Sequence, residues 1–86
     1  MTRDEIRQAI IDELSNIAPE TDPGSIAPDA DVRDSLDIDS MDFLNFVIAL
    51  HQRLRLDIPE ADYPMLRTIG GGTDYLAAKL GKQSHG

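Results

Sequence analysis

Apolar residues recur every three or four positions near the start of the chain, as they do along one face of an amphipathic helix. Thr2 and Glu5 have the spacing of a capping box, in which each side chain accepts a hydrogen bond from the other residue's backbone N–H. Pro19 cannot continue a helix. The pattern predicts a helix from about Thr2 to Asn16, and the recurring apolar positions are Ile6, Ala9, Ile10, Leu14 and Ile17.

The next segment, residues 18–38, is rich in proline and aspartate, a composition that predicts a long loop with turns. Such a loop is uncommon in a small domain unless its own side chains hold it in place. We expect four apolar residues to do so: Ile26, Val32, Leu36 and Ile38.

A second helix is predicted from Asp39 to about Arg55. Asp39 suits the N-cap, Ser40 the first helical position, and Asp42 adds favourable negative charge in the first turn. Apolar residues then occupy more than one flank, which predicts a central helix with several neighbours. They are Met41, Phe43, Leu44, Phe46, Val47, Ile48, Leu50 and Leu54.

Two shorter elements complete the pattern. Residues 57–60 lead into a short helical turn, with Pro59 at its first position and Pro64 as its limit. Thr68 opens a last helix, Gly70–Gly72 loosen its start, and Gly81 suits its C-terminal cap.

No alternation of apolar and polar residues indicates a strand. We therefore expect an all-α protein, a four-helix bundle with a long loop between helices 1 and 2 and a short third helix. One domain would span residues 1–81, and residues 82–86 would form a flexible C-terminal tail.

Composition and charge limit the partners that this protein could have. The 86 residues include 16 Asp and Glu against 8 Lys and Arg, for a net charge of -8 and a pI near 4.4. This balance argues against nucleic acid and anionic membranes as partners. There is no cysteine, no apolar run long enough to span a membrane and no signal-peptide pattern. We expect a cytoplasmic monomer.

The sequence does not match several known catalytic and metal-binding motifs. An EF-hand beginning at Asp29 would need glycine at Asp34 and glutamate at Ser40. The glycine run lacks the lysine of a phosphate-binding loop, and flexibility explains it better. His51 and His85 have no paired ligand spacing, so no metal site is expected. No arrangement indicates a catalytic triad, and we expect a protein that is not an enzyme.

Ser40 has an ordinary interpretation, that of a serine at a helix start. Three surrounding features favour a second one. The residue follows an acidic loop that should leave its hydroxyl exposed, and an unusually apolar helix follows it. It also lies where free backbone N–H groups and the helix dipole favour a phosphate.

At this point the sequence resembles the acyl carrier protein family. The resemblance runs from Leu36 through the tripeptide Asp39-Ser40-Met41 to the run Ile58-Pro59-Glu60, eighteen to twenty residues beyond the serine. It continues to Thr68-Ile69 and Asp74-Tyr75-Leu76, so it covers nearly the whole chain. The family implies a phosphopantetheine arm joined to Ser40 by a phosphodiester, whose thiol carries acyl groups as thioesters. The missing cysteine fits, because the reactive sulfur would be added.

The resemblance also implies roles for other residues. Asp39 would cap the helix and position Ser40. The docking surface for partner enzymes would be Met41, Asp42, Asn45, Ile48 and Glu60. The core and acyl cavity would be lined by Phe46, Val47, Leu50, Ile58 and Leu66, and plain core packing is compatible with that role. The implied partners are a phosphopantetheinyl transferase, an acyl-loading ligase or acyltransferase, and synthase or transferase enzymes.

Some positions depart from the family pattern. Asp37 replaces the usual glycine before the serine, and Arg53 and Arg55 make the far end of the second helix neutral to basic. These changes favour a specialised carrier, with a short or aminoacyl cargo, over the general carrier of fatty-acid synthesis. Two alternatives stay open: an aminoacyl or peptidyl carrier, and an unmodified helical adaptor domain.

Overall fold

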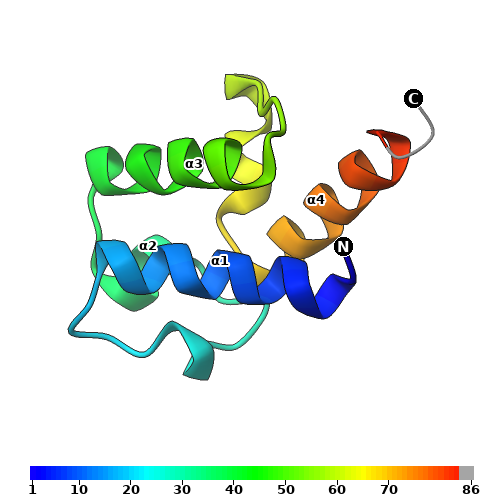
Figure 1. Cartoon of the computed structure of the whole chain (residues 1–86). Coiled ribbons are helices and arrows are strands. Elements are labelled where there is room, and N and C mark those ends of the chain that lie inside the picture. Colours follow the sequence, from blue (N-terminus) through cyan, green and yellow to red (C-terminus); the bar gives the residue numbers. More distant parts are fainter. Residues whose placement is uncertain (84–86) are drawn as a thin grey trace.

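The computed structural model describes residues 1–83 and is built from helices. Three long helices, α1 (Arg3–Ile17), α3 (Ser40–Leu54) and α4 (Ile69–Gln83), form its frame. Shorter elements join them: η1 (Pro23–Ser25), α2 (Val32–Leu36) and η2 (Glu60–Leu66). Figure 1 shows α1 and α3 side by side and antiparallel, with α4 inclined across the N-terminal end of α1. The predicted all-α architecture is confirmed.

The first helix begins as its sequence predicts. The Glu5 backbone N–H donates to the Thr2 hydroxyl at 3.2 Å, and the Thr2 backbone N–H donates to the Glu5 carboxylate at 2.8 Å. These bonds satisfy two backbone donors that a helix start otherwise leaves without partners. They also lower the pKa of Glu5, chiefly through the backbone hydrogen bond from Thr2.

The core is aliphatic, with two phenylalanines. It contains most of the predicted face of α1 and four of the eight predicted apolar residues of α3, together with residues of α4 and of the connecting segments. Three of the four residues expected to hold the first connection in place are buried, while Ile26 is half-buried. The core residues are Ile6, Ile10, Ile11, Leu14, Val32, Leu36, Ile38, Phe43, Phe46, Val47, Leu50, Leu56, Ile58, Leu66, Ile69 and Leu76.

The long connection between α1 and α3 is more ordered than expected. The prediction of a loop throughout residues 18–38 is wrong, because Val32–Leu36 forms the short helix α2. The Asp31 carboxylate caps this helix by accepting backbone hydrogen bonds from Arg33 at 2.8 Å and Asp34 at 3.4 Å. Five residues are too few to form a stable helix alone, so the cap and the burial of its apolar residues hold it.

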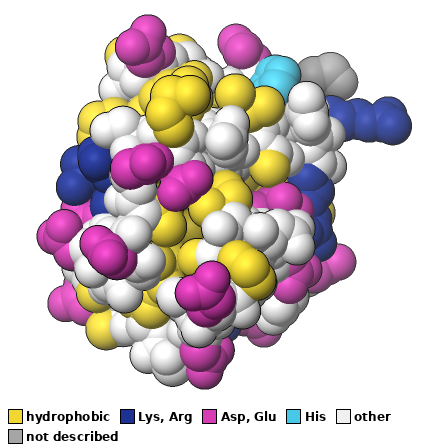
Figure 2. Space-filling model, turned by 90° about the vertical axis from the view of Figure 1, so that its left-hand side faces the viewer, with side chains coloured by type: hydrophobic (Ala, Val, Ile, Leu, Met, Phe, Trp, Pro, Cys, Tyr) yellow, Lys and Arg dark blue, Asp and Glu magenta, His cyan; other side chains and the backbone are white. Residues whose placement is uncertain are grey.

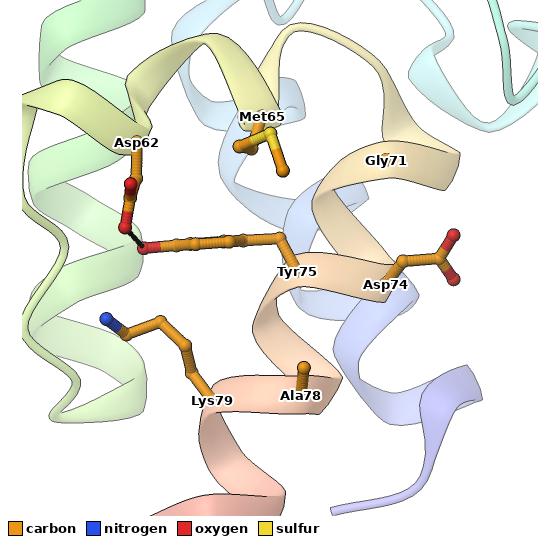
Figure 3. A pocket seen from close by; sticks show the side chains of 7 residues that line it. All are labelled: Asp62, Met65, Gly71, Asp74, Tyr75, Ala78 and Lys79. Atoms are coloured by element: carbon orange, nitrogen blue, oxygen red, sulfur yellow. Dashed lines mark hydrogen bonds between the residues drawn. The ribbon is translucent and has the colours of Figure 1, made fainter.

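The third element also differs from its prediction. It is a 3₁₀ helix of seven residues in which Pro59 is the N-cap and Pro64 lies inside, so Pro64 does not limit it. The Tyr75 hydroxyl donates to the Asp62 carboxylate at 2.6 Å and ties η2 to α4 (Figure 3). Lys79 Nζ lies 5.5 Å from the centre of the Tyr75 ring. Burial and the bond to Asp62 raise the pKa of Tyr75.

The glycine run is packed, which corrects the prediction of a loose helix start. A Cβ atom at Gly70 would lie 3.0 Å from the backbone oxygen of Pro28, and one at Gly72 would lie 3.2 Å from Leu66 Cδ2. These positions lack a side chain because neighbouring segments approach the helix backbone closely. The helix then continues past Gly81, which is therefore not its C-terminal cap, to Gln83. The last residues of the predicted tail, 84–86, lie outside the described residues.

Candidate functional site at the start of α3

Ser40 occupies the first position of α3, as predicted, and its side chain is exposed. Asp39 is the N-cap, and its carboxylate accepts a hydrogen bond from the Asp42 backbone N–H at 2.8 Å. The chain reaches this point through Asp37, which ends α2 in the left-handed conformation with φ of 53°. Aspartate tolerates that conformation better than most residues, so the turn forms without a glycine.

A pocket of about 310 Å³ opens beside Ser40, between α3 and η2. Phe43 and Leu44 on α3 face Tyr63 and Pro64 on η2 across it. Its polar lining residues are Arg33, Ser40, Glu60 and Arg67. The exposed hydroxyl therefore lies at the edge of a hollow with apolar sides and two guanidinium groups.

Arg33 contacts the candidate residue directly. Its Nη2 donates a hydrogen bond to Ser40 Oγ at 3.1 Å. Its Nε is buried and has no hydrogen-bond partner. Within the part of the chain that the structure describes, Arg33 forms no ion pair with a carboxylate. This guanidinium therefore retains free donors and an unneutralised charge next to the Ser40 hydroxyl.

Arg67 lines the same pocket, and its Nε is likewise buried without a hydrogen-bond partner, but its charge is paired. Its Nη2 lies 2.5 Å from the Asp31 carboxylate, and its backbone oxygen accepts from the Val32 N–H at 2.7 Å. Burial raises the pKa of Asp31, but the hydrogen bonds from Arg67 and from the start of α2 outweigh it and lower the pKa overall. The Arg67–Asp31 pair thus joins the end of η2 to the start of α2.

The residues expected to dock partner enzymes lie on the surface near Ser40. Met41 and Ile48 are apolar yet expose 65% and 41% of their surface. Asn45 and Glu60 are exposed, and Asp42 is half-buried. Figure 2 shows this side of the molecule, where acidic side chains are interspersed among hydrophobic ones.

The residues expected to line an acyl cavity are buried between the helices: Phe46, Val47, Leu50, Ile58 and Leu66. Two of them, Val47 and Ile58, also line a surface hollow of about 210 Å³ between α3 and the segment before η2. Its other lining residues are Ile48, His51, Asp57 and Tyr63, so the hollow is partly apolar and partly polar.

Sequence reasoning missed six of the residues that line the pocket: Arg33, Phe43, Leu44, Tyr63, Pro64 and Arg67. A signal for Arg33 was present, because it is the only basic residue among the six aspartates between Asp29 and Asp42. Arg67 carried no comparable signal, since it is 27 residues away from Ser40 in sequence and only the fold brings it to the pocket.

The described residues contain no cluster of metal-ligating side chains and no helix suited to cross a membrane. Between Met1 and Gln83, no three His, Cys, Asp or Glu side chains are grouped as a metal site would require. Over the same residues, no helix is both long and apolar enough to cross a bilayer. His85, the second histidine considered in the sequence, lies outside the described residues.

Comparison with known proteins finds similarity to acyl carrier proteins. A family model, the phosphopantetheine attachment site, matches residues 4–76. An acyl carrier protein of Picosynechococcus sp. is 30% identical over 78 residues, which cover 91% of this chain and 90% of that protein. One from Syntrophobacter fumaroxidans is 40% identical over 52 residues, covering 60% of this chain and 64% of the relative. Another, from Lactobacillus johnsonii, is 33% identical over 76 residues, covering 88% and 94%.

Proposed function

This chain belongs to the family of carrier proteins with a phosphopantetheine attachment site, and we propose that Ser40 is its attachment residue. The observation that carries the proposal is the exposed Ser40 hydroxyl at the first position of α3, at the edge of a pocket. A transferase needs an accessible hydroxyl, and the arm needs room beside it. Both requirements are met at this residue.

The family makes this protein an acyl carrier and not an enzyme. The phosphopantetheine arm supplies a terminal thiol that holds an acyl group as a thioester, chemistry that a chain without cysteine cannot supply. In the attachment step, Ser40 Oγ forms a bond to the phosphorus of the arm within coenzyme A. The pyrophosphate bond breaks, adenosine 3′,5′-bisphosphate leaves, and the hydroxyl proton passes to a base of the transferase.

The residues around Ser40 would then position the arm and meet partner enzymes. Asp39 holds the first turn of α3 in place through its bond to the Asp42 N–H. The exposed Met41 and Ile48 would give apolar contacts to a partner, and Asn45 would lie on the same surface. Asp42 and Glu60 would face basic residues of the transferase, the acyl-loading enzyme and the synthases, where charge mainly sets association rate and specificity.

The cargo would be an acyl group of fatty-acid or specialised acyl metabolism. The pocket beside Ser40, of about 310 Å³, and the hollow lined by Val47 and Ile58, of about 210 Å³, support a short chain because both are small. A longer chain would have to displace Phe46, Leu50 or Leu66, each of which is at most 1% exposed. Displacing close-packed core residues is costly, so the intact core favours a short cargo.

Intact mass spectrometry tests the attachment. The purified protein, incubated with coenzyme A and a broad-specificity phosphopantetheinyl transferase, should gain the mass of one arm. The Ser40→Ala variant should gain nothing. Ser35→Ala is the matched control, because Ser35 is also exposed and lies five residues away, and it should be modified as the native protein is.

Two results would contradict the proposal. If the native protein gained no mass, the adaptor function would replace the carrier function. If Ser40→Ala were still modified, another residue would be the attachment site.

A further inference from the structure

Arg33 lies within bonding distance of the atom to which we assign the arm. Its backbone N–H donates to the Asp31 carboxylate, which fixes the first turn of α2 and places the guanidinium over the start of α3. From there its Nη2 reaches Ser40 Oγ at 3.1 Å, while its buried Nε has no partner. A phosphate esterified to Ser40 Oγ would add non-bridging oxygens one bond beyond the atom that Arg33 already contacts.

Most charged residues around Ser40 are acidic, so a phosphate attached there would need a nearby cation. The neighbouring exposed residues Asp34, Asp37 and Asp39, with the half-buried Asp42, are acidic, and Glu60 lines the same pocket. A phosphodiester adds one more negative charge to this group. The other arginine of the pocket, Arg67, is already paired with Asp31. Arg33 is therefore the cation available to balance the new charge.

We propose that Arg33 binds the phosphodiester of the arm once Ser40 has been modified, an inference that rests on Ser40 being the attachment residue. Guanidinium groups suit this role, because their planar array of donors matches the oxygens of a phosphate. In the unmodified protein the same guanidinium donates to the Ser40 hydroxyl. Modification would replace this neutral acceptor with a charged one and strengthen the contact.

The native protein provides the first test, by NMR of the arginine side chains. The Arg33 Nε–H signal, assigned by comparison with the Arg33→Lys variant, should shift when the protein is converted to the phosphopantetheine form. The signal of Arg7, on the part of α1 that lies near the start of α4, should stay in place and serves as the internal control. An unmoved Arg33 signal in fully converted protein would overturn the proposal.

Variants provide the second test. Arg33→Gln removes the charge beside Ser40, and Arg7→Gln makes the same charge change elsewhere. All samples are taken to full conversion, verified by mass. For each protein, the melting temperature of the unmodified form is subtracted from that of the modified form. This value should be about 2–6 °C lower for Arg33→Gln than for the native protein. The ³¹P resonance of the phosphodiester should also shift in Arg33→Gln, and Arg7→Gln should change neither quantity.

The outcomes separate this inference from the proposed function. If the native protein gains the arm but Arg33→Gln matches it in both measurements, the role of Arg33 is refuted and the carrier function stands. If the native protein gains no arm, both are refuted. If Arg33→Gln fails to fold, the NMR test of the native protein decides, and an unmoved Arg33 Nε–H signal refutes the role of Arg33.

Discussion

The starts of α3 and α4 are built alike, but their surroundings differ. Both begin with a side chain that caps the helix: Asp39 accepts from the Asp42 N–H at 2.8 Å, and the Thr68 hydroxyl accepts from the Gly71 N–H at 3.0 Å. The small residue Ser40 follows Asp39 directly, and three glycines follow Thr68 after Ile69. In front of α3 lies a pocket that leaves Ser40 exposed, whereas Pro28 and Leu66 pack against the glycines of α4.

This difference shows that a small residue at a helix start has no fixed meaning. The start of α3 is small and open, as the proposed attachment at Ser40 requires. The start of α4 is small and closed, so that other segments can approach its backbone. The Gly70 N–H donates to the Pro28 backbone oxygen at 2.8 Å, a contact that a side chain would obstruct.

The largest expected effect concerns the closed start. Gly70→Val should lower the free energy of unfolding by about 1–3 kcal/mol, because its Cβ would be forced against the Pro28 backbone. Chemical denaturation measures this loss.

Two controls belong with this variant. Ser40→Ala, at the open start, should change stability by less than about 0.5 kcal/mol. Gly81→Ala, whose added Cβ would meet no described atom within 4 Å outside its chain neighbours and its own helix backbone, should gain up to about 1 kcal/mol from helix propensity. Equal losses in Gly70→Val and Ser40→Ala would remove the distinction between the two starts.

The next effect concerns Asp31, which caps α2 and pairs with Arg67, the residue before Thr68. Asp31→Ala should cost about 1–2 kcal/mol, because α2 loses its N-cap. Asp31→Asn keeps a capping oxygen and should lose less, since its partner Arg67 is partly exposed and such pairs contribute at most about 1 kcal/mol.

The loss of stability in Asp31→Asn should depend on pH. Folding lowers the pKa of Asp31, so its carboxylate stabilises the native state above the unfolded value of about 3.9. The difference between native and Asp31→Asn protein should be full at pH 7 and disappear as pH falls through the lowered pKa. Denaturation at several pH values measures it, and a difference independent of pH would show that the ion pair contributes nothing.

The smallest expected effect concerns the open start itself. Asp39→Ala should cost about 1 kcal/mol, because the Asp42 N–H loses its acceptor. Asp39→Asn, which retains a capping oxygen, should recover most of that stability. If both variants unfolded at the same denaturant concentration as the native protein, the first turn of α3 would not depend on this cap.

Much of the frame could be predicted from local signals. The caps at Thr2 and Asp39 and the apolar periodicity locate α1 and α3, since both signals arise within a few residues. α2 escaped prediction because its five residues are held by Asp31 and by burial against the rest of the fold. The packing of Gly70 could not be foreseen either, because it depends on Pro28, forty-two residues earlier.

The candidate site was predictable to a similar extent. Ser40 could be proposed from the sequence because its signals are local: a cap, a helix start and an acidic segment before it. The pocket was not, because Tyr63 and Arg67 come to it only through the fold. The sequence does show Arg33 alone among aspartates, but the contact with Ser40 Oγ appears only in three dimensions.

The most direct test of the account is to locate the arm within the chain. The native protein is converted to its modified form and digested, and the peptides are fragmented in a mass spectrometer. The account predicts that the added mass lies on Ser40 alone, and that Ser35, in the same acidic segment, carries none. An arm found on Ser35 or on any other residue would contradict the central claim that the open start of α3 is the attachment site.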